Sequence, residues 1–223
     1  MKEPYYIEVF GKYGEALNAK NLIPLPTDTS YGNLLLKIVN LANTVDFINH
    51  KSEYIYKTFK KVRTETTDPI ELLKNSTNIH LLSREIETVV YFTRRSIDEL
   101  ISLIYVLEND YPPKIKVDDI WKLLNYKKVK SKLGFLKEKY SEFLLRLNNS
   151  SNAYKHSFLN NEAYLLMGRD EPCVLVLGLK GNNLENGYEF DSISLKEILS
   201  SFESFLVDSL GILKEYSNSK EES

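Results

Sequence analysis

Cysteine and histidine are scarce in this 223-residue chain, which has one cysteine and three histidines. Because Cys173 stands alone, a disulfide within the chain and a cysteine-rich zinc site are both excluded. His50, His80 and His156 lie far apart in the sequence, so no two of them have the close spacing of a local metal site. We therefore expect no metal and no cofactor.

An excess of positive charge is also missing, since 29 lysine and arginine residues stand against 31 aspartate and glutamate residues. A protein that coats a polyanion is normally strongly basic, so any contact with nucleic acid must come from a local patch. No segment has the roughly 20 consecutive apolar residues that cross a membrane. The N-terminus has no long apolar run either. We expect no signal peptide, no membrane partner and a cytoplasmic location.

The motifs of familiar hydrolases and phosphate-binding loops are absent from the sequence. There is no nucleophile elbow, no His-Glu-x-x-His motif and no EF-hand loop. The glycines at 178 and 181 lack the Gly-Lys-Ser/Thr signature of a phosphate loop. These absences argue against a hydrolase of a common type.

What the sequence does have is helical periodicity. Apolar residues recur every three or four positions along four long segments, which is typical of amphipathic helices. The helices are expected at residues 34–62, 79–109, 133–159 and from 194 to about 213. Four long helices with short polar connections can bury their apolar sides only against one another. The sequence therefore predicts a mainly α protein, an antiparallel four-helix bundle.

A small β-hairpin is predicted between the third and fourth long helices. Two short apolar runs, residues 163–167 and 173–179, are separated by a Gly- and Pro-containing turn sequence. They place the hairpin at about residues 163–180, inserted before the last helix. The residues that follow, 181–187, are polar and predict a loop.

A fifth, short helix is predicted at residues 118–124. Asp118 or Asp119 would be its N-cap, because an aspartate side chain can accept a hydrogen bond from the first turn. Its tryptophan, Trp121, is expected to face inward.

The remaining segments complete the expected domain organisation. Residues 1–30 predict an N-terminal extension with one short strand at residues 5–10. Residues 31–217 predict the helical bundle, and the polar residues 218–223 predict a disordered tail.

One stretch of the third helix carries polar residues at a regular spacing. With Leu147 and Tyr154 toward the core, Asn148, Asn152 and His156 follow one another at intervals of four residues on the opposite side. Three polar side chains one turn apart can share hydrogen bonds and face a ligand or a partner chain. The alternative is a solvated helix face in an asparagine-rich protein.

The segment from Ser151 to His156, Ser-Asn-Ala-Tyr-Lys-His, resembles the motif of the HEPN family of helical bundles. That motif reads Arg-Asn-x-x-x-His, or has a slightly longer spacing. Asn152 and His156 match it, whereas Ser151 occupies the position of the arginine. The resemblance extends in outline over the predicted bundle, from about residue 30 to 215.

The resemblance implies a homodimer in which the motifs of two chains meet, and a metal-independent cut of RNA. In active members the histidine serves as acid or base, and the arginine neutralises charge on the phosphate. By this likeness, His156 and Asn152 would be the catalytic residues. Ser151 cannot supply a positive charge, so catalysis would need a cation from elsewhere.

Three residues are candidates for that cation: Arg94 and Arg95 on the second predicted helix, and Lys155 beside the histidine. The alternative for the two arginines is a solvated or snorkelling pair. Asn148 belongs to the same polar face of the third helix and is a further candidate for binding nucleic acid.

A cluster of lysines before the third helix is a second candidate for contact with RNA. Tyr126, Phe135 and Tyr140 lie nearby, and lysines interleaved with aromatic rings can track a phosphate backbone and stack a base. A solvated connector leading into a helix is the alternative. The cluster consists of Lys127, Lys128, Lys130 and Lys132.

Three functions follow from these observations. The first is a HEPN-like, non-catalytic module of a stress or phage-defence system that binds RNA or a protein partner. The second is a HEPN-type ribonuclease that uses His156 with a cation from outside the motif. The third is a structural helical protein without RNA contact.

Overall fold

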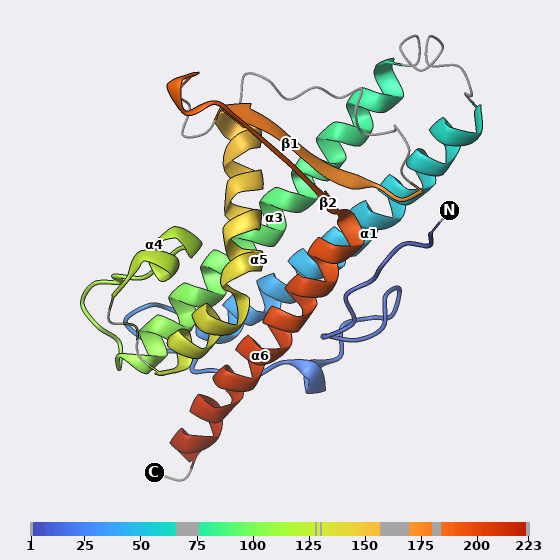
Figure 1. Cartoon of the computed structure of the whole chain (residues 1–223). Helices are drawn as coiled ribbons and strands as arrows, with labels where there is room; N and C mark the ends of the chain where they lie inside the picture. Colours follow the sequence, from blue (N-terminus) through green and yellow to red (C-terminus); the bar gives the residue numbers. More distant parts are fainter. Residues whose placement is uncertain are drawn as a thin grey trace.

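The computed structural model describes residues 2–65, 76–127, 129, 131–156, 170–179 and 184–221. Within these residues the protein is mainly helical, with one two-stranded antiparallel hairpin before the last helix, as predicted (Figure 1). The elements are α1 (Leu34–Glu65), α3 (Ser76–Glu108), α4 (Ile120–Asn125), α5 (Ser131–His156), β1 (Cys173–Leu179), β2 (Tyr188–Ser194) and α6 (Leu195–Glu221). Two single-turn 3-10 helices lie at Ala19–Asn21 and Leu184–Asn186.

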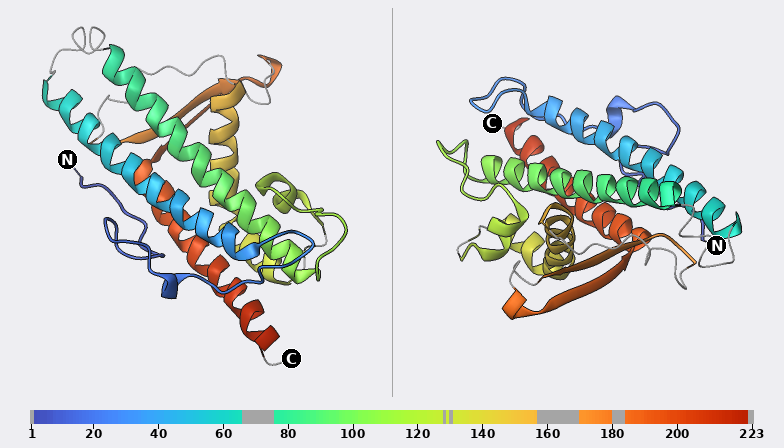
Figure 2. Two further views of the ribbon diagram at one scale, coloured as in Figure 1. Left: turned by 180° about the vertical axis from the view of Figure 1, so that it is seen from behind. Right: turned by 90° about the horizontal axis from the view of Figure 1, so that it is seen from above.

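α3 is the central element of the core. It contacts α1, α4, α5 and α6, and it lies next to α1 in both views of Figure 2. Its apolar side is wide, since Ile86, Val89, Val90 and Ile97 are all fully buried. The other helices therefore pack against a buried apolar side of α3.

α5 and α6 run antiparallel and are linked by three ion pairs. Lys139 Nζ lies 2.6 Å from Asp208 Oδ2, and Arg146 Nη1 lies 2.8 Å from Glu197 Oε1. Lys132 pairs with Glu215. The cations are spaced seven residues apart on one side of α5. Exposed pairs of this kind contribute roughly 0–1 kcal/mol each, so they fix the register of the two helices more than they stabilise the fold.

The hairpin differs from the predicted one in its second strand. β1 is the predicted strand at 173–179, but it pairs with β2, Cys173 opposite Ser194 and Leu179 opposite Tyr188. The hairpin that the structure describes therefore runs over residues 173–194, whereas the first strand of the hairpin predicted at about 163–180, residues 163–167, lies outside the described residues. The sequence did not predict β2, because charged residues interrupt its apolar positions. Of these apolar positions, Phe190 is exposed and Ile193 is buried. β1 rests on α5, and β2 leads into α6.

The N-terminal extension has no strand at residues 5–10; it lies on the helices as an irregular segment that buries Ile7 and Phe10. Asn49 of α1 takes the place of a neighbouring strand, because its amide accepts from the Ile7 N–H and donates to the Ile7 carbonyl, each at 2.9 Å. The extension therefore belongs to the same core as the helices.

Two further expectations need correction. α6 continues to Glu221, so the predicted tail at 218–223 is helical over 218–221; Ser217 helps to hold this end by donating to the carbonyl of Pro24. Asp119 is the N-cap of α4 as predicted, but Trp121 is 56% exposed. In this six-residue helix Ile120 and Leu123 occupy the buried side instead.

None of the helices in the described part of the chain has the length and apolar character to span a membrane.

Candidate functional site

Arg94 joins the motif segment of α5 to α3. Its Nη1 donates to Asn152 Oδ1 at 2.9 Å and to Ser151 Oγ at 3.3 Å. Its Nε lies 3.7 Å from Asp98 Oδ2, one helical turn further along α3. The side chain is largely covered, which strengthens these charge-assisted contacts. Of the three predicted cations, Arg94 is thus the one that contacts both Ser151 and Asn152. We call Arg94, Asp98, Ser151 and Asn152 the Arg94 cluster.

Asp98 connects this cluster to α4. Its Oδ1 accepts a hydrogen bond from the backbone N–H of Ile120 at 2.8 Å, at the first residue of α4. Burial raises the pKa of Asp98 to about 6, although the Ile120 N–H and the Arg94 guanidinium both favour the charged form. The carboxyl group therefore changes charge close to neutral pH, and sequence reasoning did not identify it. The only signal was its position four residues after Arg94 on a helix.

Lys155 lies at the outer side of the cluster. It is exposed, and its Nζ lies 5.8 Å from the centre of the Tyr91 ring, a cation–π contact between α5 and α3. Tyr91 precedes Arg94 by one turn of α3 and is itself exposed. The structure thus places two predicted cations, Arg94 and Lys155, at one junction of α3 and α5.

The polar residues predicted at intervals of four along α5, namely Asn148, Asn152 and His156, do not form a uniformly solvated face. Asn148 is 2% exposed, and no hydrogen-bond partner for its Oδ1 was found among the described residues. Ser151 is buried as well, because α5 contacts α3 on this side and α6 and β1 on the other sides. Asn152 is half-buried. The backbone of His156 ends α5, and its side chain lies outside the described part of the chain.

Arg95 is not part of the Arg94 cluster. Its Nε pairs with Glu99 Oε1 at 3.0 Å, and it lines an open groove between α1 and α3 that also contains Lys37 and Phe47. Neighbouring residues of a helix point about 100° apart, which is why the two arginines face different neighbours.

The predicted lysine cluster does not join the Arg94 cluster either. Lys127 is exposed, and Lys132 pairs with Glu215 of α6. Lys128 and Lys130 lie outside the described residues. Of the nearby rings, Phe135 is exposed and Tyr140 is buried, where it donates to Asp208.

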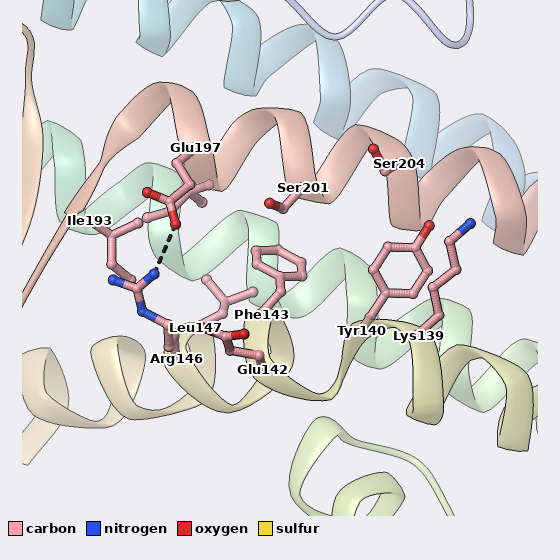
Figure 3. A pocket seen from close by; sticks show the side chains of 11 residues that line it. Lys139, Tyr140, Glu142, Phe143, Arg146, Leu147, Ile193, Glu197, Ser201 and Ser204 are labelled. Atoms are coloured by element: carbon pink, nitrogen blue, oxygen red, sulfur yellow. Dashed lines mark hydrogen bonds and ion pairs between the residues drawn. The ribbon is translucent and has the colours of Figure 1, made fainter.

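A separate cavity of about 330 Å³ lies between α5 and α6 (Figure 3). Arg146 bounds one end, donating two hydrogen bonds to Asp191 of β2 and one to Glu197. Hydrogen bonding to Arg146 lowers the pKa of Asp191 below its usual value. Phe143 projects from α5 toward α6 in the middle (Figure 3). Because the guanidinium of Arg146 is shared by two carboxylates, it serves to fasten the hairpin and α6 to α5.

Comparison with known proteins gives no relative. No protein-family model, curated protein or solved structure matches the chain.

Proposed function

We propose that the protein is a HEPN-like module that binds RNA at the Arg94 cluster without cutting it, as part of a stress or phage-defence system. The observation that carries the proposal is the pair of hydrogen bonds from Arg94 to Ser151 and Asn152. In the HEPN motif an arginine precedes the asparagine, and here a guanidinium from α3 lies beside that same position. Lys155 adds a second, exposed cation.

Binding is favoured over catalysis by the way in which Arg94 is held. A guanidinium that stabilises a phosphoryl transition state needs its paired N–H groups free for the phosphate oxygens. Nη1 of Arg94 is used by Ser151 and Asn152, and its Nε faces Asp98. The remaining Nη2 group suits a single contact with a phosphate, which positions RNA on the surface.

The second candidate is a metal-independent ribonuclease of the HEPN type that uses His156. Two observations favour it: Arg94 restores a positive charge beside Asn152, and the pKa of Asp98 is raised by burial to about 6. A carboxyl group with such a pKa can exchange a proton near neutral pH, as general acid–base catalysis requires.

The test combines RNA binding and RNA cleavage in EDTA, with single-stranded RNA and transfer RNA as probes. We expect Arg94→Gln to weaken binding about tenfold, the size of one lost charge-assisted contact. Arg95→Gln is the matched control, since Arg95 is a neighbouring arginine paired with Glu99 away from Asn152. Its affinity should equal that of the wild type.

Cleavage distinguishes the two candidates. We expect none at high protein concentration. RNA cleavage in EDTA that His156→Ala abolishes would contradict the non-catalytic proposal and support the ribonuclease. If neither binding nor cleavage is found, the remaining hypothesis is that the protein is a structural helical protein without RNA contact.

The same proposal includes three broader features. We infer that α1, α3, α5 and α6 form an antiparallel four-helix bundle of the HEPN type. We also infer that two chains associate as a homodimer and that the protein is cytoplasmic. Light scattering at micromolar concentration tests the dimer, and a monomer mass would contradict it.

A further inference from the structure

Residues 11–17, which follow the buried Phe10, form a loop that faces α1 across a cleft of about 250 Å³. The other lining residues of this cleft include buried apolar side chains of the core: Ile7, Phe10, Ala42 and Val45. Within the loop, Gly11 and Tyr13 are partly covered and the remaining five residues are exposed. Tyr13 is therefore the side chain that can hold the loop in place. We call residues 11–17 the flap.

Glycines with positive φ lie on either side of Tyr13. Gly11 has a φ of 136° and Gly14 a φ of 85°, values that residues with a side chain rarely adopt. The chain before the flap is fixed, because Asn21 Nδ2 donates to the carbonyl of Phe10 at 2.9 Å. Since glycine tolerates large changes of φ and ψ, these two positions suit the hinges of a moving loop.

The hydroxyl group of Tyr13 contacts two side chains of α1. It lies 2.7 Å from Glu53 Oε2 and 2.7 Å from His50 Nδ1, while Tyr6 stacks on the ring with the centroids 4.4 Å apart. A phenol has one proton, which is donated to Glu53, because hydrogen bonds from Lys57 and Tyr13 hold the pKa of that carboxyl below its usual value and keep it ionised. The Tyr13 oxygen must then accept from His50. This contact is a hydrogen bond only when Nδ1 carries a proton.

The other ring nitrogen of His50 also faces an acceptor. Its Nε2 lies 3.4 Å from Asp46 Oδ2, one turn earlier on α1. A neutral imidazole has one N–H and leaves either Tyr13 or Asp46 without a donor, whereas an imidazolium donates to both. The closed flap therefore favours protonated His50.

Other charged and titratable groups lie around this histidine. Glu53 is paired with Lys57 at 2.6 Å, and Lys12 and Glu15 of the flap line the same cleft as Asp46. The groups around His50 are Asp46, Glu53 and Lys57 of α1 and Tyr6, Lys12, Tyr13 and Glu15 of the N-terminal segment.

We infer that the flap is a proton-controlled lid, in which protonated His50 fastens Tyr13 and closes the cleft, and loss of that proton releases the flap. Histidine is the side chain that ordinarily changes charge between pH 5 and 8. Because the closed form binds the proton more tightly, acid favours closing and a rise in pH favours opening. This inference is independent of the proposed binding of RNA.

Cleavage by trypsin after Lys12 tests the inference, because Lys12 lies inside the flap and a protease cuts a chain segment that can leave the body of the protein. The full-length wild type and His50→Ala are compared at pH 5.5 and pH 8. Mass spectrometry follows cleavage of the bond between Lys12 and Tyr13 at early times. The two rates are divided by one another at each pH, so the pH dependence of trypsin cancels.

At pH 5.5 we expect the wild type to be cut about three- to tenfold more slowly than His50→Ala, which is the size of one hydrogen bond. At pH 8 the difference should be less than about twofold. Tyr13→Phe keeps the stacked ring and loses the hydroxyl, so it should be cut at least as fast as His50→Ala at both pH values. His80→Ala is the matched control, an exposed histidine of α3, and should be cut as the wild type is.

Three results would overturn the inference. An equal ratio of the wild-type and His50→Ala rates at both pH values, with slower cutting of the wild type, would show that the proton on His50 does not control the flap. A ratio of one at both would show that His50 does not hold Tyr13. Stronger protection at pH 8 than at pH 5.5 would reverse the predicted sign. Circular dichroism confirms that each variant is folded.

Discussion

At the scale of single residues, the difference between Arg94 and Arg95 decides the location of the site. The two side chains follow one another on α3, yet Arg94 reaches Asn152 of α5 while Arg95 pairs with Glu99 beside α1. Both were predicted as candidate cations, because a sequence shows that two arginines are present but not which neighbouring helix each one meets. The choice depends on how α3 is rotated between α1 and α5.

Asp98 provides a prediction about pH and stability. Burial raises its pKa from 3.8 to about 6, so between these values the native state holds a proton that the unfolded state has released. The contribution of Asp98 to the free energy of unfolding therefore falls as pH rises from about 4 to about 6. The groups that face it are Arg94 of α3, Asp119 beside α4 and Lys155 of α5.

Urea unfolding of the wild type and Asp98→Asn at pH 4.5 and pH 7 measures this effect. Asparagine keeps the acceptor for the Ile120 N–H and does not titrate. The stability of the wild type relative to the variant should decrease by up to about 2 kcal/mol from the lower to the higher pH. Asp118→Asn is the control for loss of an exposed carboxylate. A difference that does not change with pH would contradict the assignment.

At the scale of elements, helices were predicted well and irregular or short segments were not. The long helices follow from their periodicity, which is a local property. The pairing of β1 with β2 and the irregular course of residues 5–10 depend on contacts with α5 and α1, which local pattern does not contain. The prediction that Trp121 of α4 faces inward was wrong for a similar reason. A short helix cannot bury all of its apolar residues, and the sequence does not identify which of them stays exposed to solvent.

The attachment of the N-terminal segment to α1 provides a second prediction about stability. Asn49 is buried and satisfies both the N–H and the carbonyl of Ile7. Asn49→Ala leaves these two backbone groups without partners and should lower the free energy of unfolding by roughly 2–4 kcal/mol. Asn43→Ala, at an exposed position of the same helix, should change it by less than about 0.5 kcal/mol.

Chemical denaturation followed by circular dichroism compares the two variants with the wild type. Equal losses of stability in Asn49→Ala and Asn43→Ala would show that the side chain of Asn49 does not hold the segment.

At the scale of the whole molecule, the candidate site is a junction of three helices. Asn152 was identified from the motif, and Arg94 was one of three candidates for its cation. Asp98 and the outward position of Trp121 could not be predicted, because they depend on how α4 is fastened to α3. The fold therefore determines the site by bringing α3, α4 and α5 together, while the resemblance to HEPN proteins rests on two residues of α5.

The salt dependence of RNA binding tests the central claim most directly, namely that Arg94 contacts a phosphate. For single strands, the slope of log K against log salt changes by about 0.7 for each phosphate contact. Arg94→Gln should reduce the magnitude of the slope by about that amount, and Arg95→Gln should leave it unchanged. A wild-type slope in Arg94→Gln, or an equal reduction in both variants, would contradict the account.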